Sequence, residues 1–332
     1  LIQPWAEAGD LPNLTFLMSE GVHTPLESTR PPVTSPAWPT FATGMNPGKH
    51  GVFDFIRPIR QIQESSGGGK ARTGQFELVN ATSIRTPTLW QILSQAGRRV
   101  GVMNVPVTYP PAPVNGFVVA GMLSPMEGDF TYPADLFDRY ADSIPPYRIA
   151  PRVQYKEGNE AEFREDLLDL VERRGQYALK LMADHPNDFL MFHFQATDVA
   201  QHALWKLVDP THPRHDPQAD ARSGHILKQL YRRIDSYIGQ MLNRLEEDTT
   251  VIVMSDHGFG PLHYVVNLNL FLLDQGLMKL KKGAWTRLKA GLFRAGLTPA
   301  SVWHLIESTG LQNYVWQVSK STRNKVVGKF LS

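Results

Sequence analysis

The sequence contains no cysteine, which excludes disulfide bonds and cysteine-ligated zinc sites and is consistent with a cytoplasmic protein. No apolar run approaches the roughly 20 residues that a membrane-spanning helix needs. Neither sign of charge dominates, because Lys plus Arg number 34 and Asp plus Glu 32, which leaves a formal net charge of +2. No internal repeat is present. What remains is a chain of 332 residues, 42% hydrophobic, that can bury a sizeable core in one large domain or two smaller ones.

The clearest chemical signal is a carboxylate beside an imidazole at the end of an apolar run. The stretch 249–254, TTVIVM, is rich in β-branched residues and predicts a strand buried on both faces. Asp256 and His257 follow it, and open α/β sheets bind ligands at the carboxyl ends of their strands. A tight turn at Gly258 would let both side chains reach one ion, and this ligand pair suits zinc or a similar metal. The alternative is a turn that only caps the next helix.

A second Asp and His pair follows another apolar run. The stretch 188–195, DFLMFHFQ, predicts a further buried strand, and Asp198 and His202 come shortly after it. Residues four apart project from the same face of a helical turn, so the two could share a ligand. One such pair would be explained equally well by a solvated Asp to His contact. Two pairs, each beyond a predicted strand, match a site that holds two metal ions roughly 3.5 to 4 Å apart.

A nucleophile is offered by the proline-rich stretch 31–50, PPVTSPAWPTFATGMNPGKH, which predicts a rigid turn carrying Thr34 and Ser35. A hydroxyl needs a base or a metal to lower its pKa before it attacks at neutral pH. No histidine lies close by in the sequence, which favours metal activation, although a base from a distant part of the chain is an alternative. His50 is interpreted as a structural histidine.

These motifs together resemble the type I phosphodiesterase/nucleotide pyrophosphatase family of the alkaline phosphatase superfamily. The resemblance rests on TSPAWPTFATG and NPGKHG near Thr34, on TDVAQH, on SDHGFGP, and on the stretch 86–125, which is similar to the bacterial and archaeal branch. It covers most of residues 10–275. It implies an alkaline phosphatase-like three-layer α/β/α sandwich with a mostly parallel sheet and cap insertions.

The resemblance also implies roles for the residues. Thr34 would be a metal-bound nucleophile that the substrate's phosphorus transiently esterifies. Asp256 and His257 would hold the metal that activates Thr34, and Asp198 and His202 would hold the second metal. The cofactors would be two divalent ions, zinc first and manganese as the alternative.

Three departures from the family pattern stand out. An early strand ending in Asp-Gly and a histidine well downstream of DHG supply further metal ligands in the family, and neither is in this sequence, so we expect a fragment that lacks both ends. His263 could substitute as a ligand, with an ordinary loop histidine as the alternative. Phe55 stands where animal nucleotide pyrophosphatases have an asparagine that holds a phosphoryl oxygen, so nucleotide specificity is not implied.

The remaining pattern alternates helices with short apolar strands, which predicts a mostly parallel sheet. Thr86 is expected to cap a helix that has Pro87 at its first position. The expected helices span 11–20, 86–97, 162–182 and 224–247, and the further expected strands span 22–28, 100–105 and 117–121.

We expect a catalytic core at residues 1–275 with insertions at about 57–83 and 124–160. The segment 276–332 is expected to form a basic helical lid or cap, because residues 279–332 hold ten Lys or Arg against one acidic residue. Contact of this tail with anionic lipid or nucleic acid is the alternative.

The sequence therefore predicts a metal-dependent phosphodiesterase or nucleotide pyrophosphatase that acts on a small phosphate ester or nucleotide. A phosphonate hydrolase or phosphotransferase would use the same metals. A sulfatase is disfavoured, because Ser35-Pro36-Ala37-Trp38-Pro39 does not fit the C/S-x-P-x-R context of formylglycine. The alternative from another class is a catalytically incompetent fragment that binds anions or a partner.

Overall fold

A computed structural model describes residues 1–58, 76–125, 128–223, 225–264, 266–279, 283–297 and 301. The chain divides into two compact units, Leu1–His263 and Tyr264–Ser332. The first unit contains Thr34, Asp198, His202, Asp256 and His257.

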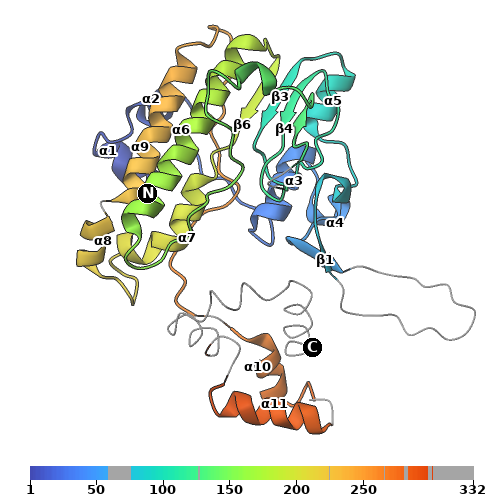
Figure 1. The fold of residues 1–332 in the computed structure, drawn as a ribbon, viewed down its shortest axis with the longest axis vertical. Coiled ribbons are helices and arrows are strands. Elements are labelled where there is room, and N and C mark those ends of the chain that lie inside the picture. The colour runs from blue at the N-terminus through green and yellow to red at the C-terminus, as the bar shows by residue number, and fades with distance from the viewer. Residues whose placement is uncertain are drawn as a thin grey trace, which may run out of the picture. The chain divides into compact units, whose positions relative to one another are not determined.

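The first unit is built on a four-stranded, mostly parallel sheet in the order β5-β4-β3-β6 (Figure 1). The central strand β3 pairs in parallel with β4 on one side and with β6 on the other. Val102 of β3 is paired with Val118 of β4 and with Met191 of β6. The short strand β5 adds to the edge of β4 in the antiparallel direction. The strands are β3 Val100–Met103, β4 Gly116–Val119, β5 Thr131–Tyr132 and β6 Phe189–Phe192.

Helices cover both faces of this sheet, because the central strands are apolar on both sides. Met103, Phe117 and Val119 pack on one face against helix α6, Glu160–Asp184. On the other face Val100, Val102 and Val118 pack against Trp38 of α3 and Trp90 of α5. These helices are α3 Thr34–Thr43 and α5 Leu89–Gln95. The expected three-layer α/β/α arrangement is thereby confirmed.

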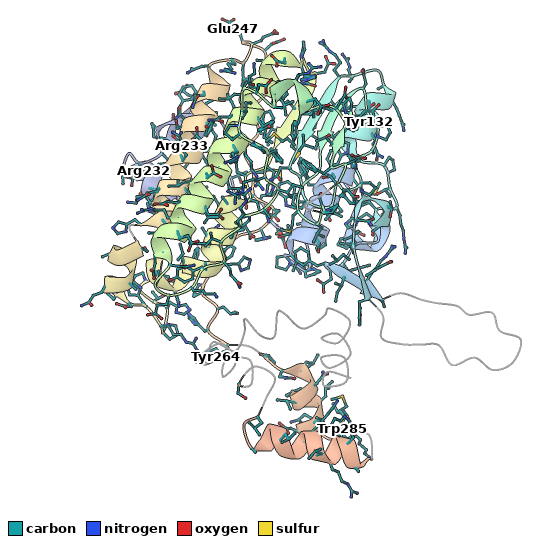
Figure 2. The ribbon with its side chains drawn as sticks, viewed as in Figure 1. Tyr132, Arg232, Arg233, Glu247, Tyr264 and Trp285 are labelled. Carbon is teal, nitrogen blue, oxygen red and sulfur yellow. The ribbon has the colours of Figure 1, made fainter. Side chains whose placement is uncertain are left out.

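A second helical core lies beyond α6. Apolar residues of α6 pack there with α7 Ala196–Val208 and α9 Ile226–Leu242, an amphipathic helix. Buried Asp235 of α9 fixes the N-terminal helix α2 by accepting the backbone amides of Asn13 and Leu14 at 3.1 and 2.8 Å. The outer face of α9 is polar, and Arg232 and Arg233 pair there with Asp10 and Glu172 (Figure 2). The other helices of this unit are α1 Ile2–Glu7, α2 Pro12–Glu20, α4 Pro47–His50, α8 Pro217–Ser223, η1 Ala81–Ser83 and η2 Asp138–Tyr140.

Two predicted strands are wrong. The stretch 22–28 is irregular and exposed up to residue 27, and the stretch 249–254 is also irregular, with Val251, Ile252 and Val253 exposed by 39%, 78% and 54%. Within the part of the chain that the structure describes, no backbone amide of 250–254 donates to another backbone carbonyl. A β-branched run becomes a strand only when a neighbouring strand accepts and donates its ladder hydrogen bonds.

Smaller differences concern element ends and burial. The helix expected from Thr86 begins at Leu89, because the side chain and amide of Thr88 pair with Gln91 and form the cap. Strand β6 is half-buried, not buried on both faces. The stretch expected as a cap insertion at 124–160 supplies β5 to the sheet and also contributes core residues, among them Leu136 and Tyr140.

A two-stranded hairpin of β1 Ile56–Pro58 and β2 Phe76–Leu78 flanks the expected insertion at 57–83, most of which lies outside the described residues. The second unit contains α10 Leu268–Asp274 and α11 Ala284–Arg294. Most of the basic tail also lies outside the described residues. None of the helices among the described residues has the length and apolar character required to cross a membrane.

Candidate active site

Thr34 is the first residue of helix α3 and not part of an isolated turn. It is 8% exposed, and its position follows from Val33, whose extended backbone ends the preceding segment and begins the helix. Among the described residues no carbonyl accepts from the amides of Thr34 and Ser35, and Pro36 has no N–H. The helix start therefore presents one hydroxyl and two unused amides, an arrangement that favours an anion.

The imidazole of His257 faces this hydroxyl. Its Nε2 lies 3.1 Å from Thr34 Oγ1, and its Nδ1 lies 3.0 Å from the carbonyl oxygen of Gly258. A carbonyl can only accept, so Nδ1 carries the proton and the lone pair of Nε2 points at Thr34. The same nitrogen lies 3.4 Å from Asp256 Oδ2. His257, 223 positions from Thr34 in the sequence, thus meets its side chain, and Asp256 lies beside the same imidazole nitrogen.

Asp198 and His202 lie in the first two turns of α7, the helix that follows β6. Asp198 Oδ1 is 3.5 Å from His202 Nε2 and 4.0 Å from His257 Nε2. The helical spacing predicted for this pair is therefore present. The contact between Asp198 and His257 joins the two Asp/His pairs in one cluster beside Thr34.

Burial sets the electrostatics of the two carboxyl groups. The side chains of Asp198 and Asp256 are only 25% and 14% exposed, and desolvation raises the pKa of each above its ordinary value. The charges of His202 and His257 oppose the rise in the pKa of Asp198. His257 also opposes the rise in the pKa of Asp256, whereas the charge of Asp198 adds to it. Two mutually repelling carboxylates near one imidazole nitrogen form a site that a cation would stabilise.

The donor set fits divalent metal ions, although no group of three or more His, Asp or Glu side chains with metal-holding geometry occurs among the described residues. The fit rests on two buried carboxylate oxygens, Asp198 Oδ1 and Asp256 Oδ2. Neither accepts a hydrogen bond in the part of the chain described. Buried polar groups are normally satisfied, and carboxylate oxygens beside imidazole nitrogens suit zinc.

Two contributors to the site were not found from the sequence. Ser28 donates its hydroxyl to the carbonyl oxygen of Asp256 at 2.5 Å and so fixes the bend that carries Asp256. Phe259 packs edge-on against His202, with ring centroids 4.8 Å apart, and also lies against Trp205 at 5.6 Å. Only the position of Phe259 directly after the DHG motif could have signalled its role.

The other hydroxyl and histidine candidates have different surroundings. Ser35, expected as a turn residue, lies in the first turn of α3 and is fully buried, and its Oγ has no hydrogen-bond partner among the described residues. His50 is also fully buried, accepts the amide of Val52 at 3.2 Å and contacts Thr40 Oγ1 at 2.9 Å, which confirms its structural interpretation. His263 lies beside His212, with ring centroids 5.9 Å apart.

The residues that follow β3 and β6, Asn104 and His193, tie the ends of the two strands together. Asn104, a buried residue with φ of 65°, donates to the carbonyl oxygen of His193 at 2.9 Å. His193 Nδ1 donates in return to the carbonyl oxygen of Asn104 at 2.9 Å, and its ring lies edge-on against Trp38. Burial, reinforced by the charge of Arg174, lowers the pKa of His193 to about 3, so its ring is neutral. Asparagine adopts the left-handed conformation more readily than most other residues, which suits it to this junction.

Comparison with known proteins identifies the family of the chain. No curated protein matches the sequence. The family model described as type I phosphodiesterase / nucleotide pyrophosphatase matches residues 1–317, which include all five site residues. This is a family of hydrolases that act on phosphodiester or nucleotide pyrophosphate bonds. On the strength of this match over most of its length, the chain belongs to the type I phosphodiesterase/nucleotide pyrophosphatase family.

Proposed function

We propose that this protein is a metal-dependent phosphodiesterase or nucleotide pyrophosphatase in which Thr34 is the nucleophile. The observation that carries the proposal is the position of the Thr34 hydroxyl, which lies at a helix start and 3.1 Å from His257 Nε2. Two buried carboxylate oxygens lie next to the same imidazole, Asp256 Oδ2 and Asp198 Oδ1 of helix α7, and within the described part of the chain neither accepts a hydrogen bond.

The chain's own residues supply positioning and part of the charge stabilisation. In the first step Thr34 Oγ1 gives up its proton and forms a bond to phosphorus while the bond to the leaving oxygen breaks. This leaves an ester on Thr34, and the leaving oxygen takes up a proton and departs as the alcohol. Water then attacks the same phosphorus and restores the hydroxyl. The unused amides of Thr34 and Ser35 are available to donate to the non-bridging oxygens, whose charge a helix start favours.

His257 and the aspartates prepare the nucleophile. The lone pair of Nε2 is directed at Thr34 because Nδ1 is committed to Gly258. The residues that would hold two divalent ions, zinc or alternatively manganese, are Thr34, Asp256 and His257 for one and Asp198 and His202 for the other. Such ions would lower the pKa of the hydroxyl and neutralise charge on the leaving oxygen.

The test is hydrolysis of bis-p-nitrophenyl phosphate and of p-nitrophenyl phosphate by protein loaded with zinc or manganese. We expect diester turnover in the wild type and none above background in Thr34→Ala or in the isosteric Thr34→Val. Thr34→Ser keeps the hydroxyl and is expected to retain measurable turnover. Equal turnover by Thr34→Val and the wild type would overturn the proposal.

The same assay separates the alternative functions. Two bound ions without turnover of either ester would favour phosphonate hydrolysis or phosphotransfer, because these reactions use the same metals. Absence of bound metal would favour a domain that binds an anion or a partner without catalysis. Metal content measured on the assayed protein therefore accompanies each rate.

A further inference from the structure

A cavity of about 400 Å³ adjoins His202 on the side of α7 that faces the chain before α6. One wall is the backbone segment 151–155, and the opposite wall consists of Val199, His202 and Ala203 of α7. Phe163 of α6 also lines it. The volume lies within the range of small-molecule binding pockets. Of the residues that line the cavity, only His202 also belongs to the Thr34 cluster.

The lining of this cavity is mainly apolar and aromatic. Tyr155 and Phe163 meet edge to face with ring centroids 5.4 Å apart, and Val199 and Ala203 add aliphatic surface. The exposed residues Arg152 and Gln154 belong to the same wall. An apolar interior with exposed polar side chains in one wall suits a ring-bearing organic group better than a highly charged one.

The place of the cavity relative to the candidate site indicates which part of a substrate would enter it. His202 is 70% exposed at its side chain and contacts Asp198, and the proposed function assigns this pair to the leaving oxygen. Val199, the residue after Asp198, lines the cavity as well. A group bonded to the leaving oxygen would therefore extend into this space, whereas a group retained on phosphorus stays with Thr34.

We propose that this leaving-group cavity, the space between segment 151–155 and α7, binds the aromatic alcohol released in the first step. The inference rests on the proposed function, and it makes the cavity the determinant of leaving-group preference. Apolar contacts to a substrate ring stabilise the transition state by amounts that distinguish substrates differing in ring size.

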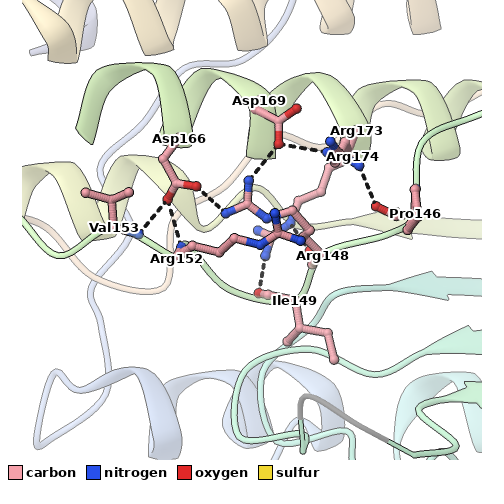
Figure 3. A network of polar contacts seen from close by, with 9 residues as sticks. All are labelled: Pro146, Arg148, Ile149, Arg152, Val153, Asp166, Asp169, Arg173 and Arg174. Carbon is pink, nitrogen blue, oxygen red and sulfur yellow. Dashed lines mark hydrogen bonds and ion pairs between the residues drawn. The ribbon is translucent and has the colours of Figure 1, made fainter. Parts of the chain in front are cut away.

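The wall of the cavity is held by a network of charged side chains (Figure 3). Asp166 of α6 accepts the backbone amides of Arg152 and Val153 at 2.8 and 3.0 Å and also pairs with Arg148 at 2.5 Å. Arg148 and Asp166 are only 5% and 8% exposed. Because both amides lie in the cavity wall, the Asp166 carboxylate fixes the position of that wall, and Asp166 is a positioning residue for the leaving group.

Other arginines fasten the chain just before the wall. Arg173 donates to the carbonyl oxygen of Pro146 at 2.9 Å, and the fully buried Arg174 donates to the carbonyl oxygen of Ile149. Asp169 completes the network through Arg148 and Arg173, at 2.6 and 2.7 Å. Asp169 accepts no amide of the wall among the described hydrogen bonds, and its side chain is 41% exposed against 8% for Asp166. Asp169→Ala is therefore the control that removes an ion pair with Arg148 without releasing the wall.

The test uses diesters that differ in one group at a time. In the first pair the retained group is methyl, and the leaving group is either p-nitrophenol or the larger 4-methylumbelliferone. In the second pair p-nitrophenol always leaves, and the retained group is methyl or phenyl. The leaving-group ratio is kcat/KM for the 4-methylumbelliferone ester divided by kcat/KM for the p-nitrophenol ester, and the retained-group ratio is kcat/KM for the phenyl diester divided by that for the methyl diester. Each ratio for a variant is divided by the same ratio for the wild type, which removes the intrinsic reactivity of the leaving groups.

We expect Gln154→Trp, which places an indole in the cavity wall from an exposed position, to lower the leaving-group ratio by about tenfold. The retained-group ratio should not change. Asp166→Ala should also lower the leaving-group ratio, and Asp169→Ala should lower it much less. Both variants are assayed well below their thermal unfolding midpoints. If Asp166→Ala does not fold, Gln154→Trp decides the outcome alone.

An unchanged leaving-group ratio in Gln154→Trp, or a change confined to the retained-group ratio, would overturn the inference while diester turnover still depends on Thr34. If the wild type shows no Thr34-dependent diester turnover, the proposed function fails, and the inference fails with it. The two failures are therefore distinguishable in one set of measurements.

Discussion

Two apolar runs of similar length precede the two Asp/His pairs, but they have different structures. The run 189–192, FLMF, forms β6 and pairs with β3 along its length. The run 251–254, VIVM, is irregular, and its first three residues are exposed. The comparison teaches that apolar, β-branched composition does not by itself produce a strand, because the ladder partner comes from elsewhere in the chain.

The two pairs are consequently held by different means. Asp198 and His202 are spaced by one turn of α7, a regular helix that packs on α6 and α9. Asp256 and His257 lie in bends fixed by individual contacts, from Ser28 to the carbonyl oxygen of Asp256 and from His257 to Gly258. Met254 supplies the one apolar anchor of this run, since it packs against the core that contains Trp38.

The largest expected effect, loss of metal and of activity, comes from substituting the aspartate of either Asp/His pair. Asp256→Asn and Asp198→Asn should each lower diester kcat/KM by about a thousandfold or more, because each removes charge that a divalent ion requires. Metal analysis should show that each variant loses one of two ions. Loss of both ions in a single variant would contradict two separately held metals.

A smaller effect is expected on stability. Leu190→Ala in β6 removes a side chain that packs in the core with Met103 and Phe117, and it should lower the free energy of unfolding by about 2 kcal/mol. Ile252→Ala removes a side chain that is 78% exposed and should change it by less than about 0.5 kcal/mol. Urea unfolding measures both. A loss at Ile252 as large as that at Leu190 would show that the 251–254 run is buried in solution.

A pH-dependent effect on stability is expected at the junction of β3 and β6. Burial lowers the pKa of His193 to about 3 in the folded protein from 6.5, so the folded state resists protonation that the unfolded chain accepts. The contribution of neutral His193 to the free energy of unfolding is fully present above about pH 6.5. It is lost as the pH falls toward 3, at no more than about 1.4 kcal/mol per pH unit.

His193→Asn removes this titration, so we expect its unfolding free energy to fall less steeply between pH 6.5 and pH 4 than that of the wild type. The change in slope is the readout, since the variant also loses packing against Trp38 at every pH. Parallel pH profiles of the two proteins would contradict the assignment.

The parts of the fold that could be predicted were those with strong local periodicity. The long helix expected at 162–182 was found as α6 at Glu160–Asp184, and the strands expected near Val100 and Phe117 were also found. The sheet neighbours could not be predicted, because nothing local specifies that β5 joins β4 antiparallel. The stretch 124–160 lacks periodicity, and so its core residue Tyr140 was missed.

Within the site, motif spacing placed Asp198 and His202 on one helical face, as the structure has them. The approach of His257 to Thr34 could not be read from the residues alone, because it joins segments 223 positions apart. The contact from Ser28 was missed for the same reason, since it joins segments 228 positions apart. Long-range contacts depend on the whole packed core and leave no local pattern.

The most direct test of the central claim, that Thr34 attacks phosphorus and carries an ester intermediate, is the stereochemistry of diester hydrolysis. A phosphorothioate diester of defined configuration would be hydrolysed in ¹⁸O-labelled water, and the configuration of the product phosphorus determined by NMR. Two successive in-line displacements, first by Thr34 and then by water, predict net retention. Net inversion would show that water attacks phosphorus directly, and it would contradict the account.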